Sequence, residues 1–446
     1  MFHVNQTIFA LASAQGRAGV SIIRLSGPEA VPALKRLTGK SVPPRRAVFT
    51  PLIHDGELID EAVVVYFQGP NSFTGEDCVE LHVHGSRAIL DRLYAILTDF
   101  GLRLAQPGEF SRRALENGKL DLTQAEAITD LVDAESEAQR RQALTQMGGG
   151  LKVQYEAWHA ALVEILARIE VYIDFPDEDL PGELVDSILD RIAAIQASLE
   201  AAIADAKRGR QIREGFRIVI LGEPNAGKSS LFNALLKAET AIVTPIAGTT
   251  RDVIEAQLRI GPYSVLLYDT AGLRETDEVV EQEGIRRARA KGDEADLRLW
   301  VIDSSASGLE GVEPRARDLI AFNKIDQGSD NLYESFSNLS VSRETQLFKV
   351  SVETGQGVAD LVAAIENIVT ERLSVQTFPA ATRARHTERL QEAVDHLDQA
   401  RLTRMRVPEL TAEHVRAGIN SFEALFGRYD VEDVLDVVFS TFCIGK

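Results

Sequence analysis

Residues 216–230 read FRIVILGEPNAGKSS, an apolar run followed by a glycine-rich loop that ends in lysine and serine. From Gly222 to Ser229 this stretch matches the G-x-x-x-x-G-K-S pattern of a phosphate-binding loop. Its glycines would let backbone N–H groups approach phosphates, Lys228 would reach the β- and γ-phosphates, and Ser229 could bind Mg²⁺. We therefore predict a strand over 216–221, the loop, and a helix that begins near Ser230.

Three further motifs accompany this loop along the chain. Asp269-Thr270-Ala271-Gly272 ends the next strong strand, placing a carboxylate near the Mg²⁺ shell and a glycine where backbone can meet the γ-phosphate. Asn323-Lys324-Ile325-Asp326 matches the N-K-x-D element of GTPases, whose aspartate accepts hydrogen bonds from guanine. Thr249 and Thr250 lie where a switch threonine completes the Mg²⁺ shell. Four ordered motifs resemble a translation-factor-type GTPase and predict that the base is guanine.

The base-binding end departs from the GTPase pattern at one point. Such proteins usually carry an S-A-K-like sequence that contacts the base through its backbone, and Ser351-Val352-Glu353 stands in that place here. Only Ser351 matches. We expect guanine selectivity from Asp326 and leave the stacking against the base open.

The residue that orients the attacking water in Ras-like enzymes is missing. Leu273 stands where those enzymes have a glutamine, and an aliphatic side chain cannot hold water. Glu281 is a candidate to position water through an intermediary, although its acidic segment is also typical of a solvated surface. Asn225, with backbone oxygens at 244–249, could hold a monovalent cation against the phosphates, or it could be an ordinary loop asparagine.

Length, composition and charge limit the class of protein. The chain has 446 residues, which favours two to four domains, and 45% of them are hydrophobic, which excludes intrinsic disorder. The 67 acidic and 48 basic residues give a net charge of −19, so any nucleic-acid contact must be local or delegated to a partner.

Two cysteines indicate a reducing compartment. The apolar N-terminal run has no basic segment before it, and no run reaches about 18 apolar residues, so we expect a cytoplasmic protein without a membrane span.

The flanking sequence predicts two further kinds of domain. Short β-rich runs over 1–118 indicate an α+β domain with a helix at about 86–99. Helical periodicity then indicates long helices within 155–172 and 184–203, separated by prolines, and returns over 386–446.

A multidomain α/β and all-α fold follows from this order. Residues 211–372 alternate apolar strands with helices, which predicts a mostly parallel sheet covered on both faces. We expect this Ras-like P-loop domain to be inserted into a discontinuous helical domain. The predicted domains are the α+β domain 1–118, the first helical part 119–210, the GTPase domain 211–372 and the second helical part 373–446.

Seven stretches outside the nucleotide motifs look like those of one known family. They are Thr7–Ala10, Gly16–Val20, Ile23–Gly27, Pro70–Asp77, Pro107–Phe110, Lys119–Leu122 and Phe442–Lys446. Together they resemble the MnmE (TrmE) family of tRNA-modification GTPases from the first strand to the last residue. The family implies a folate-binding N-terminal domain that dimerises, and a GTPase domain inserted in a helical domain.

The resemblance also implies an activity, cofactors and partners. It implies a K⁺-stimulated GTP hydrolase that needs Mg²⁺ and forms a homodimer whose GTPase domains meet across the nucleotides. With the FAD-dependent flavoprotein MnmG, in a heterotetramer or larger complex, such an enzyme modifies C5 of the wobble uridine, position 34, of certain tRNAs. The carbon comes from 5-formyl-tetrahydrofolate or a related tetrahydrofolate.

Site residues follow from the resemblance position by position. Asn225, Thr244, Ile246 and Thr249 would frame K⁺, and Ser229 and Thr250 would hold Mg²⁺. The expected catalytic residues are Glu281, Lys228 and Cys443. The expected nucleotide contacts are Asn225, Ala226, Gly227, Lys228, Ser229, Ser230, Thr244, Thr249, Thr250, Asp269, Thr270, Ala271, Gly272, Asn323, Lys324, Asp326 and Ser351. The expected folate contacts are Arg24, Glu80, Lys119 and Lys446, although Arg24 or Glu80 is from composition alone more typical of a paired surface charge.

Cysteine and histidine side chains allow competing interpretations. Cys443 could be a reactive thiol or a small buried hydrophobe, and the resemblance favours the thiol. Cys78 lies in a strand pattern that indicates packing. His82 and His84 share a strand face, but no cysteine or carboxylate completes a metal-ligand spacing there, so we expect hydrogen bonding.

A second class of function stays open, a ribosome-associated regulatory GTPase that acts as an RNA-binding switch. It would need a basic module near the C-terminus. Arg401, Arg404 and Arg406 are the best candidates, yet their acidic neighbours are also typical of a solvated helix face. A tRNA-modifying enzyme depends instead on the N-terminal domain and the Cys-Ile-Gly-Lys tail.

Overall fold

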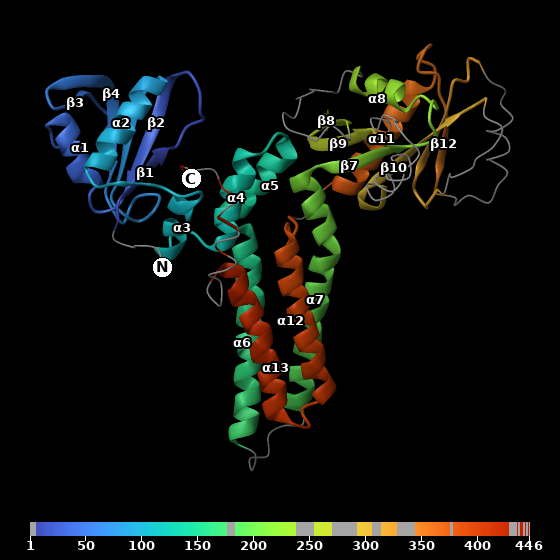
Figure 1. Cartoon of the computed structure of the whole chain (residues 1–446). Helices are drawn as coiled ribbons and strands as arrows, with labels where there is room; N and C mark the ends of the chain where they lie inside the picture. The colour runs from blue at the N-terminus through green and yellow to red at the C-terminus, as the bar shows by residue number, and fades with distance from the viewer. Residues whose placement is uncertain are drawn as a thin grey trace, which may run out of the picture. The chain divides into compact units, whose positions relative to one another are not determined.

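The computed structural model describes residues 6–175, 183–237, 254–269, 292–305, 314–327, 344–374 and 378–427, with 435, 438, 439, 442 and 445. The chain divides into two compact units (Figure 1). The first comprises residues 1–129, 146–197 and 388–446, and the second comprises 130–145 and 198–387.

A six-stranded mixed sheet forms the N-terminal part of the first unit. Its order is β3 (Val48–His54), β4 (Glu57–Phe67), β5 (Cys78–Gly85), β2 (Ala18–Ser26), β1 (Ile8–Leu11) and β6 (Arg103–Leu104). Neighbouring strands are antiparallel except β1 and β6, which are parallel. Helices α1 (Ala30–Thr38) and α2 (Arg87–Asp99) pack their apolar sides on this sheet.

The predicted strands and the helix of this region are confirmed. Alternate residues such as Ile23, Leu25 and Leu81 are fully buried under the two helices, as expected for a sheet with one covered face. Helix α2 begins where predicted because the Ser86 side chain caps it, accepting a hydrogen bond from the Ile89 N–H at 3.3 Å.

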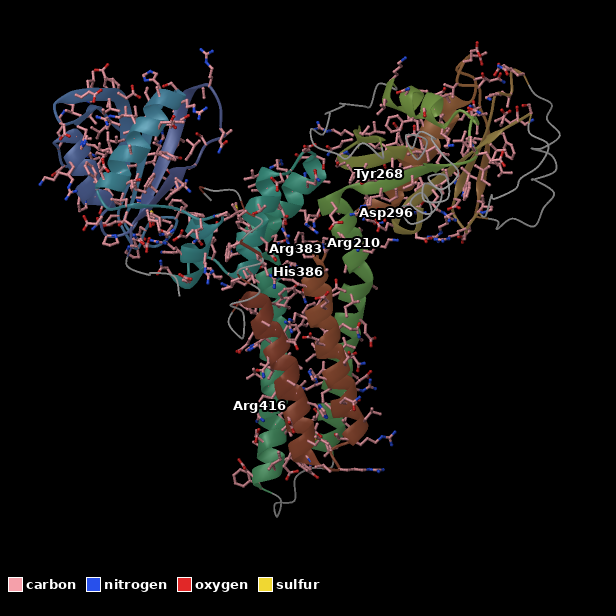
Figure 2. All side chains as sticks on the ribbon, viewed as in Figure 1. Arg210, Tyr268, Asp296, Arg383, His386 and Arg416 are labelled. Atoms are coloured by element: carbon pink, nitrogen blue, oxygen red, sulfur yellow. The ribbon has the colours of Figure 1, made fainter. Side chains whose placement is uncertain are left out.

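Long antiparallel helices make up most of the rest of the first unit. Helix α6 (Gly150–Asp174) lies beside α13 (Pro408–Phe426), and Tyr155, Trp158 and Phe422 form the aromatic contact between them. Arg416, labelled in Figure 2, donates to Glu170 across the same pair at 2.7 Å. These helices confirm the predicted periodicity, and α6 ends just before Pro176 as expected.

Two further helices pair in the same manner. Helices α7 (Glu183–Glu214) and α12 (Ala384–Thr403) are joined by Gln196, which donates to Asp398 at 2.8 Å and accepts from Arg401 at 2.9 Å. Shorter helices are α3 (Glu109–Glu116), α4 (Leu122–Val132) and α5 (Glu137–Met147). No helix within the described ranges has the length and hydropathy to cross a membrane.

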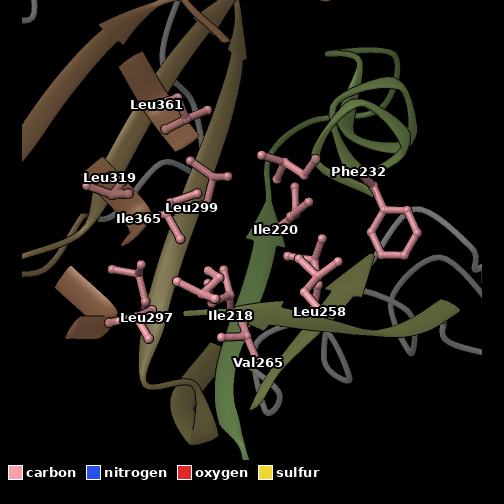
Figure 3. Packing of buried hydrophobic residues seen from close by; sticks show 14 of the residues in the cluster. Ile218, Ile220, Phe232, Leu258, Val265, Leu297, Leu299, Leu319, Leu361 and Ile365 are labelled. Atoms are coloured by element: carbon pink, nitrogen blue, oxygen red, sulfur yellow. The ribbon is translucent and has the colours of Figure 1, made fainter. Parts of the chain in front are cut away.

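The second unit is built on a mostly parallel sheet. Its order is β12 (Gln346–Lys349), β11 (Leu319–Asn323), β10 (Leu297–Asp303), β7 (Phe216–Leu221), β9 (Tyr263–Asp269) and β8 (Ile254–Ile260). Among the described strands of this sheet, only β8 is antiparallel to its neighbour. Helices α8 (Lys228–Lys237) and α11 (Val358–Leu373) cover one face, and Figure 3 shows residues such as Ile220, Phe232 and Leu361 in that core.

The predicted parallel sheet is confirmed, with one correction at its first helix. Helix α8 begins at Lys228 rather than near Ser230, because the loop conformation ends at Gly227 with a φ of +93°. The predicted domain boundaries stay predictions; the described strands and helices of this sheet run from Phe216 to Leu373.

Candidate nucleotide site

The phosphate loop connects β7 to α8 at the carboxyl edge of the second sheet. Gly222 has a φ of +143°, and a Cβ there would overlap the carbonyl oxygen of Val301 on β10. Asn225 also has a positive φ, +63°, which asparagine tolerates better than most residues. The loop therefore holds its shape because glycine and asparagine occupy the positions that need them.

Lys228 is the buried cation of this loop. Its Nζ donates to the carbonyl oxygens of Gly222 at 2.9 Å and Glu223 at 2.8 Å, and the residue is 6% exposed. Burial lowers the pKa of Lys228, while the charges of Asp269 and Glu223 work in the opposite direction. The lysine is thus held over the loop, and Ser229 and Ser230 follow it as exposed residues in the first turn of α8.

Asp269 ends β9 next to this lysine. It is fully buried, and it pairs in register with Ile220 of β7, the strand that leads into the loop. A carboxylate at this place is suited to the Mg²⁺ shell. The structure thus brings Asp269 to the same sheet edge as Lys228.

The base-binding motif is attached to the loop by direct hydrogen bonds. Asn323 Nδ2 donates to the Ala226 carbonyl at 2.9 Å, and Asn323 Oδ1 accepts from the Val352 N–H at 3.3 Å. Lys324 Nζ donates to the Asn225 carbonyl at 2.8 Å. Four elements distant in sequence therefore converge at one edge of the sheet.

Asp326 and Ser351 also meet at this edge. The Ser351 hydroxyl donates to Asp326 Oδ1 at 2.5 Å and accepts from the Thr354 N–H at 3.2 Å. This pairing orients the carboxylate expected to bind guanine. It also gives Ser351 a function that does not require the rest of the S-A-K pattern.

Asp303 is a residue of the site that sequence reasoning missed. It ends β10, and its carboxylate accepts from Lys324 Nζ at 2.7 Å and from Ser305. Burial acts to raise the pKa of Asp303, but the hydrogen bonds from Lys324 and Ser305 outweigh it and lower the pKa. The sequence feature that could have identified Asp303 is its position as an acidic residue at the end of a central strand.

Ten of the expected site residues lie outside the described residues. They are Thr244, Ile246, Thr249, Thr250, Thr270, Ala271, Gly272, Glu281, Cys443 and Lys446. The roles expected of them in binding K⁺, Mg²⁺ and folate and in catalysis stay predictions.

The expected folate residues of the N-terminal sheet form a second cluster. Arg24 donates to Glu80 Oε1 from Nε at 3.1 Å and Nη2 at 2.9 Å, so the two are paired. The guanidinium also lies over the rings of Phe73 and Phe110, at 5.4 and 5.8 Å from their centroids. Sequence reasoning assigned no role to these phenylalanines, and their place beside Arg24 depends on tertiary packing. Lys119 is exposed, and a Cβ on Gly75 would contact its side chain at 3.4 Å.

The histidines beside this cluster are hydrogen bonded, as predicted. His82 Nε2 lies 3.3 Å from Glu80 Oε2, and His84 Nδ1 lies 2.8 Å from Asp60 Oδ1. Cys78 is buried, as its strand pattern predicted. Cys78 lies within hydrogen-bonding distance of Ser26 and Thr74.

A phosphate loop, a strand-end aspartate and an N-K-x-D guanine-binding motif on one mostly parallel sheet define the class as a P-loop GTPase. Family models match most of the chain: the "MnmE helical domain" over residues 122–443 and the "GTP-binding protein TrmE N-terminus" over 7–119. The chain belongs to the MnmE family of tRNA modification GTPases.

Individual relatives agree over their full length. The tRNA modification GTPase MnmE of Caulobacter vibrioides is 48% identical over 99% of this chain and 100% of its own. That of Maricaulis maris is 44% identical over the same shares. A solved structure, the G domain of the T. maritima FeoB iron transporter, covers 34% of this chain and 97% of its own at 26% identity, but its TM-score of 0.24 is too low to bear on the fold. The chain is therefore a GTP hydrolase of the tRNA-modifying kind.

Proposed function

We propose that this GTPase, with an FAD-dependent flavoprotein partner of the MnmG kind, modifies C5 of the wobble uridine of certain tRNAs using a tetrahydrofolate one-carbon unit. The observation that carries the proposal is the position of the C-terminal tail. A Cβ on Gly445 would overlap the carbonyl oxygen of Leu11 on β1. Leu11 pairs with Ile23, and Ala10 pairs with Arg24. Gly445 therefore lies against the strand next to the one that carries Arg24.

The chemistry of this cluster suits a folate. A folate presents a carboxylate-bearing glutamate tail, which calls for cations such as Arg24 and Lys119. Its pterin ring presents N–H donors, which a carboxylate such as Glu80 can accept, and a flat face that aromatic rings such as Phe73 can stack against. Lys446 would add a third cation. Cys443, three residues from the end, would supply a thiol to the same region.

The nucleotide site suits GTP with two metal ions. Ser229 stands at the start of α8, where a hydroxyl can bind Mg²⁺ together with Thr250. The Asn225 side chain is exposed and makes no hydrogen bond within the described part of the chain. It is therefore available to bind K⁺ with Thr244, Ile246 and Thr249.

We also propose a homodimer that joins the flavoprotein in a heterotetramer or larger complex. The missing water-orienting glutamine at Leu273 supports a second subunit at the GTPase site. Glu281 would position the water. The alternative of a ribosome-bound RNA switch has less support, because Arg401 is hydrogen bonded to Gln196 within the helical pair.

The proposal predicts that Cys443→Ser removes wobble modification but leaves GTP hydrolysis nearly normal. Mass spectrometry of tRNA nucleosides from a deletion strain should show unmodified wobble uridine, and the wild-type gene should restore the modification. The Cys443→Ser gene should fail to restore it, whereas a Cys78→Ser gene is the matched cysteine control and should succeed. Normal wobble nucleosides in the deletion strain would refute the proposed function, and rescue by Cys443→Ser would refute the role of that thiol.

A further inference from the structure

A cavity of about 450 Å³ lies in the second unit at the amino edge of its sheet, away from the nucleotide motifs. It is formed where β10 begins at Leu297 and where Asp318 precedes β11, with α7 and the last turn of α11 on its sides. Asp296, labelled in Figure 2, belongs to its lining. The nucleotide motifs stand at the opposite ends of the same parallel strands, roughly 20 Å away along β10.

Basic residues dominate the lining of this cavity, in a chain of net charge −19. Two acidic residues, Asp296 and Asp318, face six basic ones. The basic residues are Lys207, Arg208, Arg298, Arg315, Arg317 and Arg372.

Both carboxylates already have partners within the protein. Asp318 accepts from Arg298 Nε at 3.0 Å and Nη2 at 2.5 Å, from Trp300 Nε1 at 3.1 Å and from the Arg315 N–H at 2.8 Å. It thereby neutralises Arg298 and leaves little capacity for the other cations.

Asp296 is occupied in the same way. Its Oδ1 accepts from Gln211 Nε2 at 2.7 Å and its Oδ2 accepts from the Arg217 N–H at 3.0 Å. These donors are neutral, and they hold the carboxylate against α7 and β7.

Arg372 is one of two lining cations that form no ion pair with any described residue. Within the described residues, its guanidinium donates one hydrogen bond, to the Asp296 carbonyl at 2.5 Å, and lies over the Phe216 ring at 5.9 Å. Burial and the neighbouring charge of Arg317 lower the pKa of Arg372. Lys207 is exposed and forms no ion pair with any described residue.

Arg208 pairs with the partly buried Asp205 at 2.7 Å, and the two remaining cations, Arg315 and Arg317, are held by surface pairs. Arg317 pairs with Glu344 at 3.0 Å, and both side chains are more than half exposed. Arg315 pairs with the exposed Asp293. Such pairs contribute about 0–1 kcal/mol, so a stronger anion can displace them.

We propose that this cavity binds phosphate groups of an RNA backbone, which rests on the proposed function because that function makes tRNA the substrate. Guanidinium groups bind phosphate oxygens in pairs, and phosphate contacts dominate RNA affinity. A protein partner would need an aromatic or large apolar anchor. Among the described lining residues the only large apolar one, Leu297, is 2% exposed. None of the described lining residues is aromatic and able to stack a base. The contact is therefore independent of base sequence.

A salt series with the full-length chain tests this proposal. The probe is a fluorescently labelled tRNA transcript, and its anisotropy gives the affinity between about 50 and 200 mM KCl. The variant is Lys207→Gln/Arg372→Gln, and the control is Arg87→Gln/Arg210→Gln, which removes the same charge from exposed positions outside the cavity. We expect the slope of log affinity against log salt to fall by about 1.5 and the affinity to fall about tenfold in the variant alone.

Three further measurements separate loss of phosphate binding from misfolding and from binding of small anions. GTP turnover checks that the variants are folded, and Lys207→Gln alone, at an exposed position, should still lower the slope by about 0.8. Unchanged tRNA affinity and slope would overturn the proposal. Inorganic tripolyphosphate is a second probe. If the double variant loses tripolyphosphate binding but keeps tRNA binding, the cavity is a small-anion site, and this result would also overturn the proposal. Neither result affects the wobble-nucleoside test, so failure of this inference and failure of the proposed function are distinguishable.

Discussion

Gly227 joins the phosphate loop to the base-binding motif at the scale of one residue. Its φ is +93°, and a Cβ there would overlap Nδ2 of Asn323. Asn323 cannot easily move away, since its amide group is held by Ala226 and Val352. The absence of a side chain at Gly227 therefore allows two nucleotide motifs to pack directly on each other.

Gly227→Ala should abolish most GTP binding. The substitution forces a positive φ on alanine, at a cost of about 1–3 kcal/mol, and pushes Asn323 away from the loop. Gly261→Ala is the matched control, because Gly261 also has a positive φ, +54°, but a Cβ there meets no atom within 4 Å. Titration with a fluorescent GTP analogue should show at least about tenfold weaker binding for Gly227→Ala and near-normal binding for Gly261→Ala. Equal affinities in the two variants would contradict this account.

The role of a single residue in the site was predictable from the sequence where the spacing of a short motif defines that role. The G-x-x-x-x-G-K-S and N-K-x-D patterns located Lys228 and Asn323, because backbone geometry fixes such short motifs. The contact of Asp303 with Lys324 and the position of Phe73 beside Arg24 were not predictable. They depend on which strands become neighbours, and one sequence does not state that.

Helix α3 depends on a buried ionic network at its first turn. Glu109, 4% exposed, accepts from Arg103 Nη2 at 2.5 Å, from Arg113 Nη2 at 3.1 Å and from the Gln106 N–H at 2.9 Å. Burial acts to raise the pKa of Glu109, but the hydrogen bonds from Arg103 and Gln106 and the two arginine charges outweigh it and lower the pKa. The charged carboxylate is therefore the form that the fold requires.

Glu109→Gln should destabilise the N-terminal domain by about 1–3 kcal/mol, because it removes the anion of the partly exposed Arg103 and one of the two anions of the buried Arg113, which keeps its pair with Glu76 at 3.0 Å. A carboxyl group whose pKa is lower in the folded state stabilises the fold above its unfolded pKa, about 4.5, and loses that stabilisation as pH falls through the folded value. Urea unfolding at pH 7 and at pH 3 should therefore show a smaller difference between wild type and Glu109→Gln at pH 3. The exposed Glu116, paired with Arg112 on the same helix, supplies the control Glu116→Gln, for which we expect little change. A variant difference that stays constant between the two pH values would contradict the assignment.

Elements with strong local signals were predictable, and the others were not. Apolar runs such as Phe216–Leu221 and the heptad-like spacing in α6 specify their own structure. The sequence analysis did not specify helices α1, α3, α4, α5 and α11 or strands β1, β3, β6 and β8. Strand β8 reads IEAQLRI, and this strict alternation of apolar and polar residues is a local strand signal that the sequence analysis overlooked. Helix α3 is held by the Arg103–Glu109–Arg113 network, so tertiary contacts rather than local pattern determine it.

The order of elements along the whole chain was predictable because each region has its own periodicity. Period-2 runs, helical repeats and alternating strands and helices follow one another, so an inserted sheet between helical halves was the simplest arrangement. The cation and the second subunit expected at the GTPase site can be tested only on the assembled molecule. Both described lysines of the site donate to loop carbonyl oxygens, Lys228 to Gly222 and Lys324 to Asn225.

We expect the protein to hydrolyse GTP faster in K⁺ than in Na⁺. We also expect turnover per protomer to rise with protein concentration. A cation bound by Asn225 and a second subunit would supply the charge stabilisation that the absent glutamine cannot, an effect on the order of tenfold or more. Asn225→Ala should lose the preference for K⁺ but keep most GTP affinity, whereas Asn233→Ala, on the exposed side of α8, should behave as wild type. Steady-state turnover across a protein dilution series in matched KCl and NaCl measures both effects. Equal rates in the two salts would remove K⁺ from the mechanism, and turnover per protomer independent of concentration would show that one subunit is sufficient.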